Sequence, residues 1–198
     1  PGYQGHLASL APRYDLALAQ KLMQQAGYGS GFRLSMIAPN NRYVNDAKIA
    51  QAVVIMLAKI NIKVDLVTMP KAQYWKKYDQ ASSDLMMLGW HSDTEDSANF
   101  SEMLAMCRNP DSGYGRYNGG HYCNPEVDRL VSASAKQTNL KKRTQMLQQV
   151  EQILYQDAAF VPLHWQHLAW GARKGINIKD VLTVMNIPYL ADLVVAQP

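Results

Sequence analysis

The sequence predicts an α/β fold, with a largely mixed sheet flanked by helices. Helical and strand-like patterns alternate along the 198 residues, and neither repeats nor low-complexity tracts interrupt them. An order of strand, helix, strand, helix is typical of a layered α/β domain. A chain of this length suits one domain and buries roughly 70% of its unfolded surface, which is enough for a stable core without metals.

Two pairs of a helix followed by a strand are expected in the N-terminal third of the chain. Asp15 is placed to cap a helix that ends at Gly27. Residues 32–36 then alternate between apolar and polar, as a half-buried strand does. Asn45 is expected to cap a second helix, and residues 62–66 alternate again as a second strand. The side chains of the second helix that recur at helical spacing and should face the core are Ile49, Val53, Met56, Leu57 and Ile60.

The middle of the chain adds three helices and one strand. Pro70 opens a short helix that continues through Lys77, and the apolar run 84–89 is short enough for a buried strand. After a long loop, Asn124 and Asn139 are the expected caps of two further helices. Their inward side chains are expected to be Val127, Leu130, Val131 and Ser134 on the first helix, and Leu140, Leu147, Val150 and Leu154 on the second.

The C-terminal part of the chain is expected to supply the remaining strands. Residues 160–165 have a strand pattern, and residues 181–195 contain further strand-like stretches that Pro188 interrupts. His164 in the first strand and His167 just beyond it are three residues apart, and in an extended chain this spacing sends them to opposite faces. The sequence therefore predicts no metal site there.

Charge and hydropathy exclude several function classes. The net charge is only +4, and the one dense basic cluster, Lys141-Lys142-Arg143 beside Lys136, is interpreted as the solvated start of a helix. A nucleic-acid interface needs a stripe of cations, so no nucleic-acid partner is expected. No run of about 18 apolar residues is present. The first residues lack the basic start and apolar middle of a signal peptide, so we expect a processed product or part of a longer chain.

The most informative stretch runs from Gly89 to Asp96. A buried strand is expected to end at Gly89, and Trp90, His91, Asp93 and Asp96 follow it. Ligands of open α/β sheets bind in the crevice beyond the strand ends, where Trp90 can present a π face and Asp93 or Asp96 a carboxylate. The alternative is a loop with a core Trp and solvated acids.

Cys107 and Cys123 are the only cysteines, and their separation does not match a zinc ribbon. The loop between them is rich in glycine, and a disulfide would tie it down at roughly 3 kcal/mol for a loop of this size. Such a bond indicates an oxidising compartment. The alternative is two unrelated thiols.

Several short motifs, in order, resemble the second lobe of the family 5 extracytoplasmic solute-binding proteins, the dipeptide- and oligopeptide-binding type. The resemblance covers nearly the whole chain. The motifs are Tyr14-Asp15 with Ala26-Gly27-Tyr28, the run from Ile60 to Val64, Gly89-Trp90 with Asp93, the run from Tyr122 to Asp128, and Pro162-Leu163-His164.

This resemblance implies a two-lobed periplasmic binding protein that holds a short peptide between its lobes and delivers it to the permease of an ABC transporter. It implies that Asp93 receives the α-ammonium of the ligand, that Trp90 lies beside the ligand, and that Cys107 and Cys123 are bonded. It further implies that residues 1–174 form the C-terminal lobe, and that residues 175–198 return to an N-terminal lobe that this sequence lacks. No cofactor, metal or catalytic residue is expected.

Two features leave the ligand class open. Met87 stands where some oligopeptide binders of the family have an Arg, and His91 matches no position of the family pattern. Relatives of this family bind nickel complexes, haem and sugars, so a metal complex, haem or a sugar is the first alternative to a peptide. A hydrolase that uses Asp93 and His91 is the second alternative, but the sequence contains no nucleophile or oxyanion signature for it.

Overall fold

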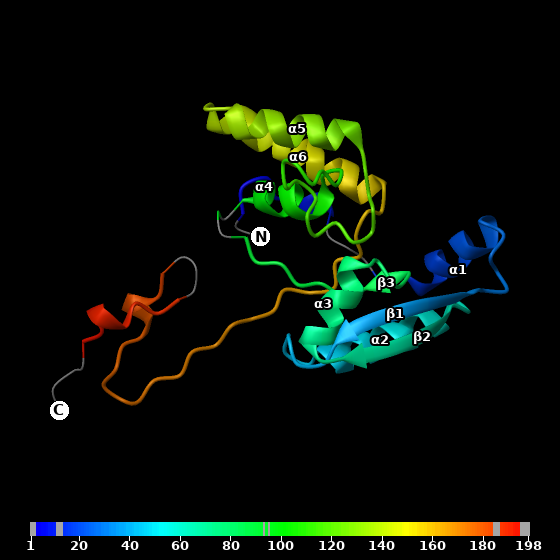
Figure 1. The fold of residues 1–198 in the computed structure, drawn as a ribbon, viewed down its shortest axis with the longest axis horizontal. Helices are drawn as coiled ribbons and strands as arrows, with labels where there is room; N and C mark the ends of the chain where they lie inside the picture. Colours follow the sequence, from blue (N-terminus) through cyan, green and yellow to red (C-terminus); the bar gives the residue numbers. More distant parts are fainter. Residues whose placement is uncertain (1–2, 11–13, 93, 95, 184–186, 195–198) are drawn as a thin grey trace. The chain divides into compact units, whose positions relative to one another are not determined.

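The computed structural model describes residues 3–10, 14–92, 94, 96–183 and 187–194. The chain divides into two compact units, Pro1–Pro162 and Leu163–Pro198 (Figure 1). The first unit contains all the helices of more than one turn and the sheet among these residues.

A three-stranded parallel sheet organises the first part of this unit, with strand order β2-β1-β3. Its strands are β1 (Arg33–Pro39), β2 (Lys63–Met69) and β3 (Leu85–Met86), and α2 (Asp46–Ala58) and α3 (Lys71–Asp79) connect them in turn. This β-α-β-α-β order confirms the α/β fold. The sheet is parallel rather than mixed over the described strands, because each strand is joined to the next by a crossover helix.

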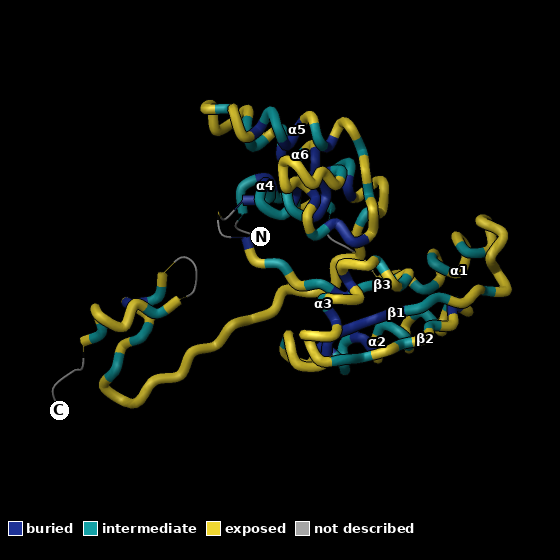
Figure 2. Tube along the Cα trace, viewed as in Figure 1, coloured by how far each residue is buried: buried dark blue, intermediate teal, exposed yellow. Residues whose placement is uncertain are grey.

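Alternate side chains of β1 pack on different helices. Met36 and Ala38 belong to a cluster with Ala50 of α2, whereas Ile37 belongs to a cluster with Tyr74 and Tyr78 of α3. Because successive strand residues point to opposite faces, α2 and α3 cover opposite faces of the sheet. In Figure 2 the second half of the central strand β1 is buried.

The structure confirms the predicted caps at Asp15, Asn124 and Asn139. The side chains of these residues accept hydrogen bonds from backbone N–H groups at the start of α1 (Leu16–Gln25), α5 (Pro125–Lys136) and α6 (Leu140–Gln156). The predicted stop of α1 at Gly27 is also confirmed, because this glycine has a φ of +81° directly after the helix.

The cap expected at Asn45 is wrong. Asn45 precedes α2, but it has a φ of 58° and its side chain makes no capping hydrogen bond. The buried Asp46 carboxylate instead accepts the Ala47 N–H in the first turn of α2 and the N–H groups of Arg42 and Tyr43 in the preceding loop. Burial raises the pKa of Asp46, but these hydrogen bonds outweigh it and keep the pKa below its usual value. The loop between β1 and α2 is therefore fixed by one carboxylate.

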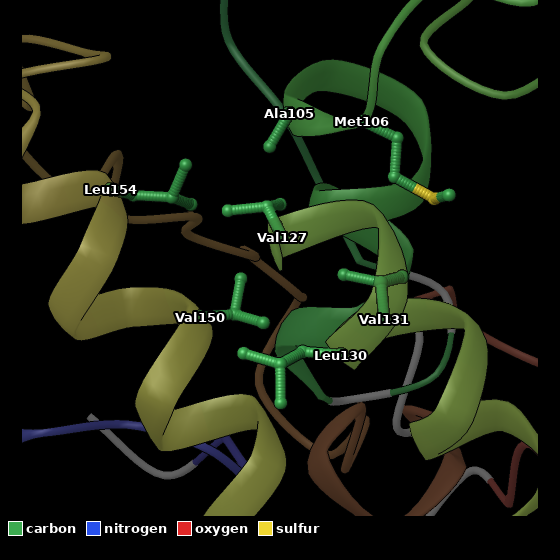
Figure 3. Packing of buried hydrophobic residues seen from close by; sticks show 7 residues of the cluster. All are labelled: Ala105, Met106, Val127, Leu130, Val131, Val150 and Leu154. Atoms are coloured by element: carbon green, nitrogen blue, oxygen red, sulfur yellow. The ribbon is translucent and has the colours of Figure 1, made fainter. Parts of the chain in front are cut away.

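A second core lies between α5 and α6. Figure 3 shows Val150 and Leu154 of α6 facing Val127, Leu130 and Val131 of α5. Ala105 and Met106, at the end of the π-helical turn η2 (Ser101–Ala105), complete this cluster. The predicted inward stripes of both helices are confirmed, except that Leu140 is 70% exposed in the first turn of α6. On α2, Met56 of the predicted stripe is likewise exposed. The buried apolar residue of this helix is Ala50, which the prediction did not include.

The second unit is largely irregular. Its described helices are the single turns η3 (Lys179–Val181) and η4 (Leu190–Asp192), and Leu182 and Pro188 form one isolated antiparallel bridge. The strand predicted over residues 160–165 is wrong, because those residues are irregular and belong to no strand. In place of the strand-like stretches predicted within residues 181–195, the described residues form only that isolated bridge. None of the described helices has the length and apolar character needed to cross a bilayer.

Candidate ligand-binding site

Two loops that follow neighbouring parallel strands meet at the carboxyl edge of the sheet. Arg42 and Tyr43 follow β1, and Gly89 and Trp90 follow β3. The Tyr43 hydroxyl donates to the Gly89 carbonyl at 3.4 Å. A Cβ on Gly89 would lie 2.8 Å from the Tyr43 ring, so only glycine fits this contact. This edge is where open α/β sheets bind ligands.

Two neighbours determine the orientation of the Trp90 indole. Its Nε1 donates to the Asn99 side-chain oxygen at 2.9 Å. Its ring centroid lies 5.5 Å from that of Tyr117, at an interplanar angle of 54°. The guanidinium of Arg116 lies over the Tyr117 ring, 5.6 Å from its centroid. Since the indole N–H is already used, Trp90 is left with its ring surface for contact with a ligand.

Two buried tyrosines of α3 donate hydrogen bonds to the backbone that carries Trp90 and Tyr117. The Tyr74 hydroxyl donates to the Met87 carbonyl at 2.5 Å, and the Tyr78 hydroxyl donates to the Tyr117 carbonyl at 2.6 Å. Burial raises the pKa of both phenols, so both remain neutral donors at physiological pH. One helix therefore fixes the backbone before Trp90 and the backbone of Tyr117.

The loop after Trp90 closes on Asp96. The Ser92 hydroxyl donates to the Asp96 carbonyl at 2.9 Å, and the Thr94 hydroxyl donates to the Asp96 carboxylate at 3.1 Å. His91 is exposed. Asp93, the residue with the leading sequence-predicted role, lies outside the described residues.

Asp96 is engaged within the protein. One carboxylate oxygen accepts the Ala98 N–H and caps α4 (Ser97–Phe100), while the other lies 2.7 Å from Nη1 of Arg143. The prediction that Arg143 belongs to a solvated basic cluster is wrong, because its side chain is only 19% exposed in this ion pair. The sequence shows the charge of Arg143 but not its partner, which lies 47 residues earlier in the sequence.

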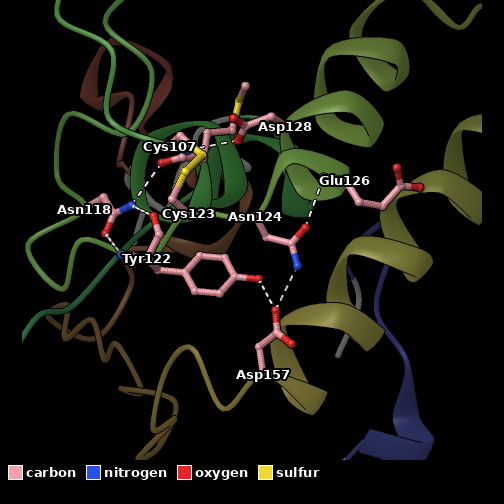
Figure 4. The surroundings of a disulfide bond; sticks show 9 residues. Cys107, Asn118, Tyr122, Cys123, Asn124, Glu126, Asp128 and Asp157 are labelled. Carbon is pink, nitrogen blue, oxygen red and sulfur yellow. Dashed lines mark hydrogen bonds between the residues drawn. A yellow bond between two sulfur atoms is a disulfide. The ribbon is translucent and has the colours of Figure 1, made fainter.

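The structure contains the predicted disulfide between Cys107 and Cys123, with the two Cα atoms 4.4 Å apart (Figure 4). Inside the closed loop, the buried Asn118 side chain donates to the carbonyls of Met106 and Tyr122. Tyr117 lies next to Asn118 in this loop. The disulfide and Asn118 thereby support the aromatic partner of Trp90.

A second contact ties the end of this loop to α6. The Tyr122 hydroxyl donates to the Asp157 carboxylate at 2.6 Å, and the Asn124 side chain donates to the same oxygen at 3.0 Å (Figure 4). Burial and the Asp157 carboxylate together raise the pKa of Tyr122 to about 12. This phenol therefore stays protonated and keeps the loop joined to the helix end.

Two open hollows on the described surface, of about 470 and 520 Å³, do not include Trp90. One lies beside Leu7 and α6, and the other beside β2 and α3. Ligand sites usually enclose most of their ligand. The described residues contain no group of three potential metal ligands.

Sequence reasoning missed Tyr43 as a neighbour of Gly89 and Tyr117 as a neighbour of Trp90. Tyr43 could have been found, because it follows the end of β1 by as many residues as Trp90 follows the end of β3, and parallel neighbours end at one edge. Tyr117 gave no comparable signal, because its position depends on the path of the disulfide loop.

Comparison with known proteins decides the family. Residues 1–112, more than half of the chain, match the model of the bacterial extracellular solute-binding proteins, family 5, middle region. The chain belongs to this family. The sequence resemblance on which the two-lobed prediction depended is thereby confirmed at the level of the family.

Similar proteins include peptide and haem binders. The chain is 31% identical to di/tripeptide-binding protein 1 of Pseudomonas aeruginosa over 83% of its length, and 29% identical to haem-binding protein A of Haemophilus influenzae over 76%. It spans about 30% of the length of these relatives.

Solved structures support the fold. The periplasmic binding protein DppA of Helicobacter pylori, in complex with the peptide STSA, matches 82% of this chain with a TM-score of 0.72 and 28% identity. The dipeptide-binding protein of Pseudoalteromonas sp. SM9913, in complex with Met-Leu, matches 80% with a TM-score of 0.72 and 26% identity. The match covers 31% and 32% of those chains, respectively.

Proposed function

We propose that this chain is the ligand-binding C-terminal lobe of a periplasmic solute-binding protein that captures short peptides for an ABC transporter. The observation that carries the proposal is the fixed Gly89-Trp90 element at the carboxyl edge of a parallel sheet, with Tyr43, Tyr117 and Asn99 around it. The names of the peptide-binding relatives add support for the peptide class.

In this proposal, each charged end of a short peptide pairs with a side chain of opposite charge at the site. Asp93 receives the α-ammonium, and the Trp90 ring lies along the peptide or its side chain. Arg42, which follows β1 at the same edge and lies 5.0 Å from the Tyr43 ring centroid, receives the carboxylate. His91, exposed beside Trp90, is a further candidate contact. Asp96 supports the loop rather than the ligand, because both of its carboxylate oxygens already have partners.

The opposing wall of the site comes from a second lobe. A single lobe leaves one side of the ligand in water, and a solvent-exposed ion pair contributes only about 0–1 kcal/mol. We infer that residues 1–174 belong to the binding lobe and that residues 175–198 pack on the N-terminal lobe. The chain alone should therefore fold but bind peptides more weakly than the complete protein.

The second candidate is a non-peptide solute, and the similarity to a haem-binding protein favours haem in particular. The two candidates differ in charge pattern, because haem has carboxylates but no ammonium group. A peptide site therefore depends on Asp93, whereas a haem site does not.

The test is titration calorimetry of the complete protein with free and N-acetylated dipeptides, Met-Leu and dialanine among them, and with haem. Asp93→Asn should weaken binding of free peptides by orders of magnitude, since removing one member of a desolvated charge pair typically costs about 3–5 kcal/mol. Asp111→Asn is the matched control, because Asp111 is exposed on the disulfide loop.

Three outcomes separate the alternatives. Equal affinity for free and acetylated peptides would contradict the role of Asp93. Binding of haem without binding of any peptide would favour the second candidate. Mass spectrometry of the recovered peptide would show cleavage if the protein were a hydrolase, and intact peptide if it only binds.

A further inference from the structure

Three segments that are distant in sequence meet behind the ligand-binding loop. Arg143 of α6 lies 2.7 Å from the Asp96 carboxylate, and the same Nη1 donates to the side-chain oxygen of Gln4 at 2.7 Å. The backbone of Gln4 pairs with that of Asp96 in an isolated parallel bridge, and its carbonyl accepts the Ser97 N–H at 3.1 Å. Arg143 therefore joins α6 to the loop and to the N-terminal segment at one point.

This ion pair differs from the other ion pairs of the described residues in its burial. The side chains of Arg143 and Asp96 are 19% and 10% exposed, whereas those of Arg129 and Glu126 are 62% and 49% exposed. A shielded carboxylate without its cation is strongly unfavourable. The position of Asp96 is consequently tied to that of Arg143, while the Arg129 pair is dispensable.

Asp96 in turn fixes the chain on both sides of it. Its carboxylate accepts the Thr94 hydroxyl and the Ala98 N–H, and its carbonyl accepts the Ser92 hydroxyl. One residue beyond Ala98, Asn99 accepts the Trp90 indole N–H. These hydrogen bonds join the described residues Ser92, Thr94 and Ala98 to Asp96, and Trp90 to Asn99.

We propose that Arg143 is a positioning residue for ligand binding. It does not contact the ligand, but it holds Asp96, and through Asp96 it fixes the loop and the Asn99 side chain that orients Trp90. Part of this proposal, the effect on affinity, depends on the proposed function. The effect on the order of the loop does not.

The test compares Arg143→Gln and Arg143→Lys with Arg129→Gln in the complete protein, at a temperature where circular dichroism shows each variant to be folded. The first readout is hydrogen exchange of the backbone amides between residues 94 and 99 without ligand. The second is the dissociation constant for the dipeptide that the wild type binds best among Met-Leu and dialanine.

Arg143→Gln should speed amide exchange in this segment but not in the α5 and α6 core, and should weaken dipeptide binding by at least about tenfold. Arg143→Lys should recover part of the affinity, because lysine keeps the positive charge but replaces the rigid, planar guanidinium, whose Nη1 contacts both Asp96 and Gln4, with a flexible ammonium. Arg129→Gln should match the wild type in both readouts.

If Arg143→Gln does not fold, the double variant Asp96→Asn with Arg143→Gln removes both charges and avoids an unpaired buried charge. It should show the same faster exchange and weaker binding. Wild-type exchange and affinity in a folded Arg143 variant would overturn the proposal. If the wild type binds no dipeptide, the proposed function fails, and the exchange readout still decides whether Arg143 positions the loop.

Discussion

The indole ring of Trp90 and the phenol ring of Tyr117 lie 5.5 Å apart at an angle of 54°, and they join two loops that are distant in sequence. Trp90 follows the sheet, and Tyr117 belongs to the loop closed by Cys107 and Cys123. Because the Trp90 N–H is used by Asn99, the Tyr117 ring is the aromatic surface that limits rotation of the indole.

The first prediction is that Tyr117→Ala weakens dipeptide binding in the complete protein. An aromatic pair of this kind contributes about 0.5–1.5 kcal/mol beyond its buried area, which corresponds to roughly 2- to 10-fold in affinity. Tyr117→Phe should keep most of the affinity, because the ring remains. Titration calorimetry measures both variants, and Tyr114→Ala, in the same loop, is the control. Unchanged affinity in Tyr117→Ala would mean that Trp90 needs no second ring.

The second prediction concerns the buried hydrogen bond from Tyr74 to Met87. Tyr74→Phe should lower the free energy of unfolding by about 1–3 kcal/mol, because it leaves the Met87 carbonyl buried without this donor. Urea denaturation followed by circular dichroism measures this change. Tyr155→Phe is the control, because Tyr155 is 55% exposed and should leave the stability within about 0.5 kcal/mol. Equal midpoints for the two variants would show that water replaces the lost donor.

Much of the fold was predictable because its signals are local. The caps at Asp15, Asn124 and Asn139 are single residues before apolar stripes, and the structure confirms all three. The predicted strand over residues 160–165 was wrong because a strand requires a neighbour, which a local pattern does not show. Asn45 makes no capping hydrogen bond because its backbone is left-handed there, and the neighbouring Asp46 carboxylate accepts the Ala47 N–H in the first turn of α2.

The site was predictable only in part. Trp90 and Asp96 were identified from one short motif after a strand, but the roles of Asp96 and Arg143 depend on a contact that joins the start of α4 to α6. Arg143 is one of three adjacent cations in the sequence, and no periodic pattern distinguishes it from Lys141 and Lys142. Long-range ion pairs of this kind are set by tertiary packing, which sequence periodicity does not encode.

The third prediction is that replacing Cys107 and Cys123 together with serine lowers the free energy of unfolding by about 3 kcal/mol, given the 16-residue separation of the two cysteines. The released loop also carries Tyr117, so dipeptide affinity should fall as in Tyr117→Ala. Urea denaturation with and without reductant measures the stability change. Reductant should lower the stability of the wild type and leave the double variant unchanged. Two freely alkylated thiols in protein folded under oxidising conditions would refute the bond.

The fourth prediction concerns Glu102, a partly buried carboxyl near the Asp96–Arg143 pair. Burial and the negative charge of Asp96 raise the pKa of Glu102 above its ordinary value of 4.5, although Arg143 acts in the opposite direction. Between 4.5 and the raised pKa, the folded state binds more protons than the unfolded state. The contribution of Glu102 to the free energy of unfolding therefore falls as the pH rises through this window, and ionised Glu102 destabilises the protein at about pH 7.

Glu102→Gln should consequently be more stable than the wild type at about pH 7, and the difference should shrink as the pH falls toward about 4, where Glu102 becomes protonated in both states. Urea midpoints at several pH values measure this. Glu126→Gln is the matched control with the opposite sign, because the hydrogen bonds from Arg129 lower the pKa of the exposed Glu126. That variant should be slightly less stable than the wild type at about pH 7, by an amount that salt reduces. A Glu102→Gln variant that is less stable than the wild type at about pH 7, by an amount that shrinks on acidification, would show that the Arg143 charge, rather than burial and Asp96, dominates the pKa of Glu102.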